Sequence, residues 1–88
     1  MPYIKQDDRA TIDEWLVNSF DKVVITNPGD LNYAITRLCL AYLPANPSYS
    51  DFNSIIGVLD SAKFEFYRRK VAPYENQKAF DNGDVYDV

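Results

Sequence analysis

The chain has 88 residues, 47% of them hydrophobic and 25% charged, which is enough for one small globular domain but not for two. Nine basic residues against 13 acidic ones give a net charge of −4, which disfavours binding along a nucleic-acid backbone. The chain contains no histidine, so histidine-based acid–base catalysis and histidine-ligated metal sites are excluded. We therefore expect a single helical domain over residues 1–88, with nucleic acid an improbable partner.

The N-terminal segment and the single cysteine indicate where the protein works. Residues 1–9 lack the basic and then apolar regions of a secretory signal. No apolar run approaches the ~20 residues that a membrane-spanning helix needs. Cys39 is the only cysteine, so no disulfide within the chain supports the fold. These features predict a cytoplasmic protein with no membrane partner.

The first predicted helix covers residues 7–23. Trp15 and Leu16 belong to an apolar stripe whose members recur at three- and four-residue intervals, as on one face of a helix. The negative charge of Asp7 suits the positive end of the helix dipole at its start. The following residues, Val23–Ile25, are interpreted as an extended connection with inward-packed side chains.

The second predicted helix covers residues 28–42 and has the clearest start signal in the chain. Asn27 is a favoured N-cap, Pro28 suits the first helical position, and Asp30 can return a hydrogen bond to the cap. A hydrophobic stripe follows at helical spacing, which predicts a helix with one face toward a core.

The third predicted helix covers residues 51–71. Ser50 is interpreted as its N-cap, and a long apolar stripe follows. Proline lacks a backbone N–H and disfavours helix in the residue before it, so Pro73 is expected to end or kink the helix. Residues 74–80 then form one or two further helical turns.

After a turn signal at Asn82 and Gly83, residues 81–88 are expected to be a mobile acidic tail. Together the elements predict an all-α fold, a small three-helix domain with a short C-terminal extension and an acidic tail. The residues expected to form its core are apolar and lie on the three stripes: Trp15, Leu16, Phe20, Leu31, Ile35, Leu38, Ile55, Ile56, Leu59 and Phe66.

A second face on the long helices lies opposite the predicted core stripes. Gly57 costs roughly 1 kcal/mol relative to alanine inside a helix, so a compensating benefit such as close approach of another backbone is expected. This favours self-association into a homo-oligomer through that face. The alternative is that Phe64 folds under the C-terminal segment. The predicted interface residues are Leu40, Asn53, Gly57, Ser61 and Phe64.

The segment 64–75 combines basic and aromatic side chains. Arginine binds phosphate or carboxylate through two parallel hydrogen bonds, and tyrosine rings stack on bases. The pattern predicts a site for an anionic, nucleotide-like ligand. The alternative is that the basic residues only complement a helix C-terminus. The predicted ligand-binding residues are Tyr33, Arg37, Tyr67, Arg68, Arg69 and Tyr74.

The residues that enzymes require do not form any familiar pattern here. Cys39 lies among apolar residues, which is typical of a buried structural thiol rather than a nucleophile. The three glycines are isolated, so no glycine-rich loop can cradle a phosphate. The acidic residues of the tail lack the ligand spacing of a calcium loop. We therefore predict no catalytic activity, no cofactor and no metal.

Seven short motifs spread over nearly the whole chain form a specific set. They are MPYI at 1–4, PGDLNY at 28–33, ITRL at 35–38, IGVL at 56–59, KFEFYRR at 63–69, APYE at 72–75 and NGDVY at 82–86. In these motifs the chain resembles a family of small, functionally uncharacterised proteins of phages and prokaryotes. It departs from that family at Asn76, where an acidic residue is usual, and at Asp60, where glutamate is usual. The resemblance implies a phage or mobile-element setting and assigns no activity.

These observations lead to two expected functions. The first is a non-catalytic phage accessory protein that counters a host defence by sequestering an anionic, nucleotide-like ligand at an oligomer interface in the host cytoplasm. The second is a protein–protein interaction module, or inhibitor, that docks directly on a host protein. The phage setting supports both only by association with other small phage proteins.

Overall fold

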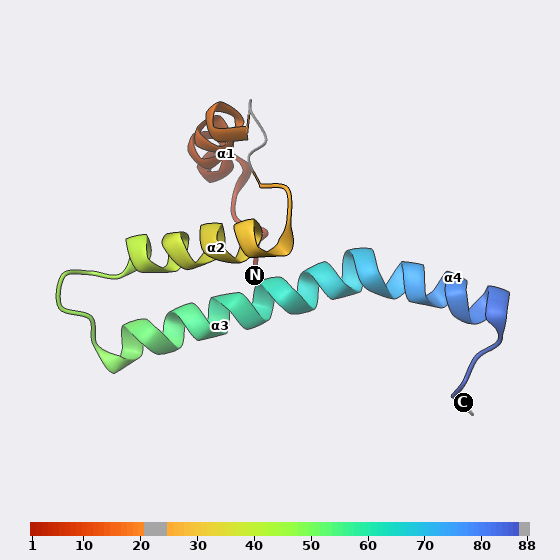
Figure 1. Cartoon of the computed structure of the whole chain (residues 1–88). Coiled ribbons are helices and arrows are strands. Elements are labelled where there is room, and N and C mark those ends of the chain that lie inside the picture. The colour runs from red at the N-terminus through yellow and green to blue at the C-terminus, as the bar shows by residue number, and fades with distance from the viewer. Residues whose placement is uncertain (21–24, 87–88) are drawn as a thin grey trace. The chain divides into compact units, whose positions relative to one another are not determined.

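The computed structural model describes residues 1–20 and 25–86, and for residues 17–20 it describes the backbone alone. All regular elements of this part of the chain are helical, which confirms the predicted all-α fold class. In chain order they are α1 (Gln6–Phe20), α2 (Pro28–Tyr42), α3 (Tyr49–Phe66), the π-helical turn η1 (Tyr67–Val71) and α4 (Ala72–Asn82) (Figure 1).

Helix α1 begins one residue before its predicted start and carries Asp7 and Asp8 in its first turn. Their negative charge complements the unpaired N–H groups at the helix start. The last residue of α1 is Phe20. The predicted end at residue 23 and most of the predicted extended connection fall on residues 21–24, which lie outside the described residues.

Helix α2 has the predicted bounds, and its cap forms as the sequence indicates. The backbone of Asn27 is extended (φ −147°, ψ 166°), and its side-chain oxygen accepts a hydrogen bond from the Asp30 backbone N–H at 2.9 Å. In return, Asn27 Nδ2 donates to Asp30 Oδ2 at 3.1 Å. This reciprocal pair satisfies an N–H that the helix leaves unpaired, which explains the sharp start.

Helix α3 begins earlier than predicted, and the prediction that Ser50 is its cap is wrong. Ser48 has this role. Its backbone N–H and its hydroxyl donate to Asp51 Oδ2 at 2.8 and 3.0 Å, and the Asp51 N–H donates to Ser48 Oγ at 3.3 Å. Ser48 stands three residues before Asp51, which is the spacing that a capping box requires. Ser50 instead lies inside α3, where its carbonyl accepts a hydrogen bond from the Ser54 hydroxyl.

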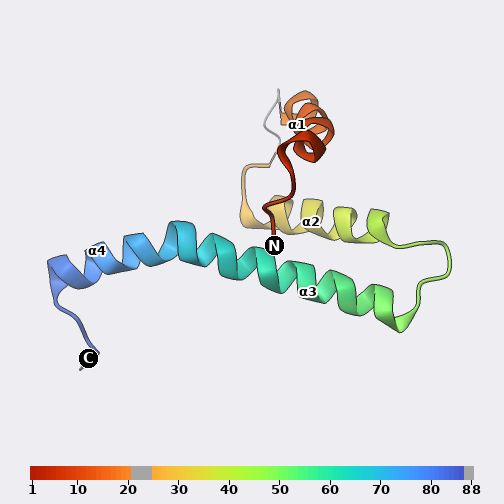
Figure 2. The same cartoon turned by 180° about the vertical axis from the view of Figure 1, so that it is seen from behind.

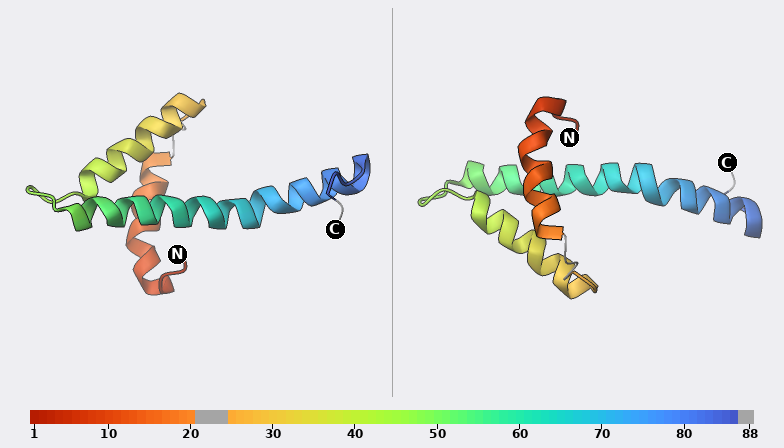
Figure 3. Two further views of the ribbon diagram at one scale, coloured as in Figure 1. Left: turned by 90° about the horizontal axis from the view of Figure 1, so that it is seen from below. Right: turned by 90° about the horizontal axis from the view of Figure 1, so that it is seen from above.

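The helical run does not end before Pro73, so that part of the prediction is wrong. After α3 the backbone forms the wider π-helical turn η1, in which the Ala72 N–H donates a hydrogen bond to the carbonyl of Tyr67, five residues earlier. Because Pro73 has no N–H and its ring would crowd the carbonyl four residues before it, a wider turn relieves the conflict. Residues 56–82 consequently form one continuous run of helical turns, seen from behind in Figure 2 and gently bent in Figure 3.

The chain divides into two compact units, which are described separately. The N-terminal unit comprises Pro2–Ile55, and the C-terminal unit comprises Ile56–Val88 together with Met1. Helix α3 runs through the boundary between them without interruption. The prediction of a single domain over residues 1–88 remains a prediction.

None of the described residues is buried, and this includes every described residue that was predicted to form the core. Trp15 is 53% exposed and Phe66 64%, while Leu16 and Ile55 are half-buried. The periodicity places each apolar stripe on a helix, but it does not supply a surface to cover that stripe. The side chain of Phe20 lies outside the described residues. The other predicted core residues are also exposed: Leu31, Ile35, Leu38, Ile56 and Leu59.

Candidate functional site

The basic residues of the C-terminal unit lie in and beside η1. Arg68 Nη2 is 2.7 Å from Glu65 Oε1, and Arg68 Nε donates to Glu65 Oε2 at 3.4 Å. Glu65 is half-buried on the preceding turn. The guanidinium of Arg68 therefore already holds a carboxylate of its own helix, and an anionic ligand would have to compete with it.

The alternative explanation was that these basic residues only complement a helix C-terminus, but they do not lie at a free helix end. Arg68, Arg69 and Lys70 lie in η1, and α4 follows directly. The carbonyl groups at the end of α3 therefore do not form a free helix end that cations would complement. Wide turns of this kind occur often at functional sites, which keeps η1 of interest.

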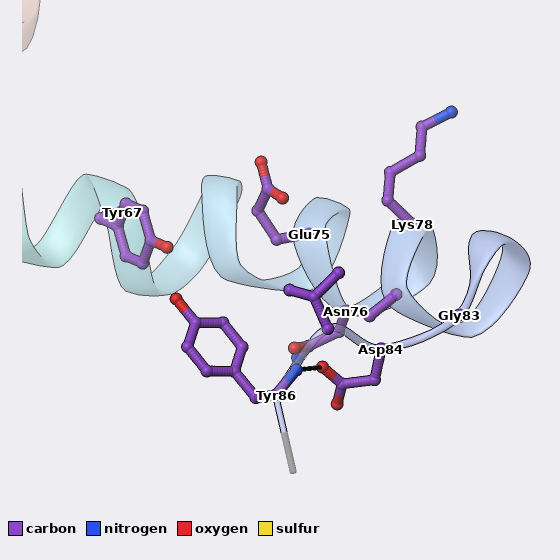
Figure 4. A pocket seen from close by; sticks show the side chains of 9 residues that line it. Tyr67, Glu75, Asn76, Lys78, Gly83, Asp84 and Tyr86 are labelled. Carbon is purple, nitrogen blue, oxygen red and sulfur yellow. Dashed lines mark hydrogen bonds between the residues drawn. The ribbon is translucent and has the colours of Figure 1, made fainter. Parts of the chain in front are cut away.

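Beside η1, the C-terminal unit has an open hollow of about 500 Å³. Tyr67 lines one side, and residues after α4 line the other. Figure 4 shows the ring of Tyr86 beside Tyr67, while the amine of Lys78 extends away from the tail. The Lys78 ammonium lies 5.5 Å from the ring centre of Tyr74, a cation–π contact that occupies this tyrosine.

The hollow exists because the chain reverses after α4. Gly83 has φ +93°, a conformation that side chains disfavour, and its N–H donates to the Ala79 carbonyl at 2.9 Å. The Tyr86 N–H then donates to Asp84 Oδ1 at 2.9 Å (Figure 4). The turn was predicted, but the hollow was missed. Its lining includes residues that the sequence analysis assigned no role: Glu75, Asn76, Lys78, Asp84, Val85 and Tyr86.

In the N-terminal unit, Tyr33 and Arg37 lie one helical turn apart and line a second hollow of about 400 Å³. Ile25 and Ala34 make part of its lining apolar. Within the described part of the chain, no hydrogen bond or ion pair engages the Arg37 guanidinium. An exposed tyrosine ring beside an unengaged guanidinium suits a planar group that carries negative charge.

Asp30 also lines this second hollow, but its carboxylate is occupied by the cap of α2. Asp30 Oδ2 accepts hydrogen bonds from the Thr26 N–H and hydroxyl, both at 3.3 Å, and from Asn27 Nδ2. These donors offset part of the carboxylate charge and hold it at the helix start. The positive charge of Arg37 therefore remains available on this face.

The six predicted ligand-binding residues thus fall into two groups. Tyr33 and Arg37 belong to the N-terminal unit and share one hollow. The other four belong to the C-terminal unit, where Tyr67 lines the first hollow and the rest lie in or just after η1. Their convergence on a single site remains a prediction. The second group is Tyr67, Arg68, Arg69 and Tyr74.

The predicted interface residues are all exposed. A side-chain carbon added at Gly57 would meet no atom within 4 Å, so nothing within the described chain requires glycine there. Phe64 is 65% exposed, and the Lys63 ammonium lies 4.8 Å from its ring centre. The prediction that these residues contact another chain remains open. Leu40 and Asn53 lie in the N-terminal unit, and Gly57, Ser61 and Phe64 in the C-terminal unit.

A family model matches residues 1–85, and its description is a domain of unknown function, DUF6899. The chain belongs to the DUF6899 family. This confirms the predicted membership of an uncharacterised family. No curated protein and no solved structure matches the chain significantly.

Two further observations concern the described part of this DUF6899 chain. Across residues 1–20 and 25–86, no three cysteine or acidic side chains gather into a group that could hold a metal ion. None of the described helices is both long enough and apolar enough to cross a membrane.

Proposed function

We propose that this chain is a non-catalytic protein-interaction module whose apolar helix faces are covered by another protein chain. The observation that carries the proposal is the complete lack of buried residues in the described chain, although 47% of the sequence is hydrophobic. A soluble monomer normally covers most of its large apolar side chains. Here Ile35, Leu38 and Leu59 are exposed at helical spacing on α2 and α3.

The energetics support the same proposal. Covering one Leu, Ile or Phe side chain contributes about 1.5–3 kcal/mol. Most of the stability of a helix in a protein comes from packing of its apolar face, and the large apolar residues on the faces of α2 and α3 are exposed. The exposed apolar stripes therefore leave these helices poorly stabilised in a single chain. The same stripes offer a surface on which another chain can pack. Contact with another chain supplies the missing apolar burial.

The proposed setting is a phage or mobile element, with the module acting on a host defence in the host cytoplasm. The resemblance to small proteins of phages and prokaryotes supports this setting by association. The docking of such a module on a defence protein would require no catalytic residue.

The test combines mass and amide hydrogen exchange on the whole chain produced in its native host cell. We expect the chain to be recovered in a complex heavier than 10.1 kDa, with the amides of α2 and α3 protected only within that complex. Chemical cross-linking followed by mass spectrometry then identifies the contacting chain. A folded monomer that protects the amides of α2 and α3 without any partner would overturn the proposal.

A second candidate function is the binding of an anionic, nucleotide-like ligand. The specific observation in its favour is the unengaged Arg37 guanidinium beside Tyr33, in a partly apolar hollow. In contrast, Arg68 is already paired with Glu65. If an anionic ligand binds, we propose that Arg37 and Tyr33 make its main contacts, and that the basic residues near η1 contribute less.

Calorimetry against a panel of nucleotides and cyclic nucleotides tests this second candidate. Arg37→Gln should abolish binding because glutamine cannot form a charged, two-pronged contact, and Arg37→Lys should weaken it strongly. Lys5→Gln removes one positive charge elsewhere in the N-terminal unit and should leave affinity unchanged. If no member of the panel releases heat, the ligand-binding function is rejected.

A further inference from the structure

We propose that the hollow beside η1 receives an arginine side chain of the partner protein. This inference rests on the proposed interaction function for the source of the arginine, but it concerns a different surface from the apolar faces of α2 and α3. Every residue that lines the hollow lies between Tyr67 and Tyr86, in the C-terminal unit. The site is therefore defined within one unit of the chain.

Two carboxylates line the hollow and have oxygen atoms available for a cation. In the described part of the chain, no hydrogen bond or ion pair engages the Glu75 carboxylate. Asp84 Oδ1 accepts the hydrogen bond from the Tyr86 N–H at 2.9 Å, and no described donor engages Asp84 Oδ2. A guanidinium has five N–H donors and no acceptor, so it complements these oxygen atoms.

The positive charges near the hollow leave room for a further cation. Lys78 is the one basic residue among those that line it, and its ammonium lies 5.5 Å from the ring centre of Tyr74. Figure 4 shows this amine extending away from the tail. The basic residues at 68–70 do not line the hollow. Residues 74–88 carry four acidic side chains and one basic side chain in the sequence, which complements a positively charged segment of a partner.

Two tyrosine rings make the hollow better suited to arginine than to lysine. Tyr67 belongs to η1 and Tyr86 to the segment after α4, and both line the hollow (Figure 4). A planar guanidinium stacks on an aromatic ring and also forms two parallel hydrogen bonds with a carboxylate. A lysine ammonium is a compact charge without this planar geometry. The rings together with Glu75 therefore match the shape and charge of arginine.

The hollow is open, which favours a side chain presented by a protein over an enclosed small molecule. Its volume of about 500 Å³ is within the ~300–1,000 Å³ of ligand sites, but such sites bury most of their ligand. Here Tyr67 is 53% exposed and Tyr86 is 77% exposed. An open site suits the tip of a longer ligand whose remainder is covered elsewhere. Tyrosine and arginine are also enriched among the residues that contribute most to protein–protein binding.

The first measurement is an NMR titration of the ¹⁵N-labelled whole chain at constant ionic strength. The probes are the N-acetyl amides of arginine, lysine and citrulline, the last of which has the shape of arginine without its charge. We expect the arginine probe to shift the amide signals of Gly83, Asp84 and Tyr86, the lysine probe to shift them less, and the citrulline probe to leave them unchanged. The inference is overturned if arginine shifts none of these signals, or shifts them no more than lysine or citrulline does.

Variants of the chain then test whether the hollow is the place of binding. Glu75→Gln should remove most of the shift that arginine causes, because a neutral amide does not form a charge-assisted pair. Asp81→Asn is the matched control. It makes the same charge change in α4, at a carboxylate that accepts a hydrogen bond from Gln77 Nε2 at 3.0 Å and does not line the hollow. Equal losses in the two variants would indicate general attraction to an acidic segment and would overturn the inference.

A third variant, Tyr86→Leu, tests the contribution of the ring. Tyr86 follows the last helix, so its replacement leaves every helix of the described chain intact in sequence. We expect smaller arginine shifts at Gly83 and Asp84 in this variant, since the guanidinium loses a ring to stack on. Unchanged shifts would reject the role of the ring in selecting arginine.

A second measurement identifies the source of the arginine in the complex recovered from the native host cell. Phenylglyoxal modifies arginine side chains, and mass spectrometry of the peptides assigns each modified arginine to its chain. We expect one arginine of the partner to be protected in the complex with the wild-type chain and reactive in the complex with the Glu75→Gln variant. A complex in which no partner arginine is protected would overturn the inference.

The outcomes separate this inference from the proposed function. A complex that protects the amides of α2 and α3, but no partner arginine, rejects the arginine site and keeps the interaction module. If the arginine probe binds to a chain that forms no complex in its host, both the module and the partner as the source of the arginine are rejected.

Discussion

Two helices of the chain, α2 and α4, each have a proline in their first turn. The backbone is broken before one of these prolines and helical before the other. Pro28 follows Asn27, which is extended, and a new helix begins there. Pro73 follows Ala72, which is helical (φ −59°, ψ −44°), and the helical run continues through it. Both residues lack a backbone N–H, so the difference comes from their neighbours.

At Pro28, the neighbours provide a complete cap, because Asn27 and Asp30 exchange hydrogen bonds. At Pro73, no side chain caps the backbone, and the wide turn η1 removes the conflict instead. In this chain the backbone breaks before the proline that has a capping side chain and stays helical before the proline that has none. Stability measurements can test this difference, and each is made at one fixed chain concentration.

The largest effect is expected from a proline at a position with neither a cap nor a wide turn. Ala62→Pro, in the middle of α3, removes an N–H and crowds the carbonyl of Val58 four residues before it. We expect a loss of about 3 kcal/mol or more in the free energy of unfolding, measured by thermal melting. Ala62→Ser is the control and should cost much less. If the Ala62→Pro variant melts like the wild type, α3 tolerates proline without help from its neighbours.

Removal of the cap should have an intermediate effect. Asn27→Ala leaves the Asp30 N–H without its acceptor, and we expect it to cost about 1 kcal/mol in denaturant unfolding. Asn46→Ala, in the loop before α3, is the matched control and should be close to neutral. Equal stability of the two variants would mean that Pro28 alone is sufficient to start α2.

Replacement of Pro73 should have a smaller effect. Because η1 already relieves the steric conflict, Pro73→Ala should change the free energy of unfolding by less than about 1 kcal/mol. The measurement is the same denaturant titration. A stabilisation near the ~3 kcal/mol cost of proline in a helix interior would show that Pro73 strains the wild-type chain.

The smallest effect is expected from the ion pair at η1. Glu65→Gln removes the negative charge that pairs with Arg68, and such a pair within one helix contributes about 0.3–0.5 kcal/mol. The loss should shrink as salt is added, since screening weakens exposed pairs. Asp60→Asn, which removes the longer 3.8 Å pair with Lys63, should cost less. A salt-independent loss at Glu65 would indicate a packing role for this side chain.

The sequence predicts the local features of the fold well. Asn27 and Asp30 predict the cap at the start of α2, and the spacing of the apolar residues predicts which segments are helical. The cap of α3 was misplaced because Ser48 and Ser50 are both suitable residue types, and only the distance to Asp51 distinguishes them. At Pro73 the sequence left an end and a kink of the helix open, because a wide turn that carries the helix onward leaves no residue-type signal in the chain.

The candidate sites were less predictable, since they depend on contacts between distant residues. The pair of Arg68 with Glu65 follows from a three-residue spacing. The approach of Tyr86 to Tyr67 depends on the direction in which the chain leaves Gly83, and a glycine permits many directions. The exposure of the apolar stripes was not predictable, because periodicity shows which face is apolar but not what covers it.

The wide turn η1 also sets the angular phase of the helical run. A five-residue hydrogen-bonded turn inserts one residue relative to an α-helix, which rotates all later side chains by about 100°. The apolar stripe of α3 therefore does not continue along the same line of α4. The apolar side chains before and after η1 therefore face different directions, and deletion of a single residue within 67–71 would bring them back into line.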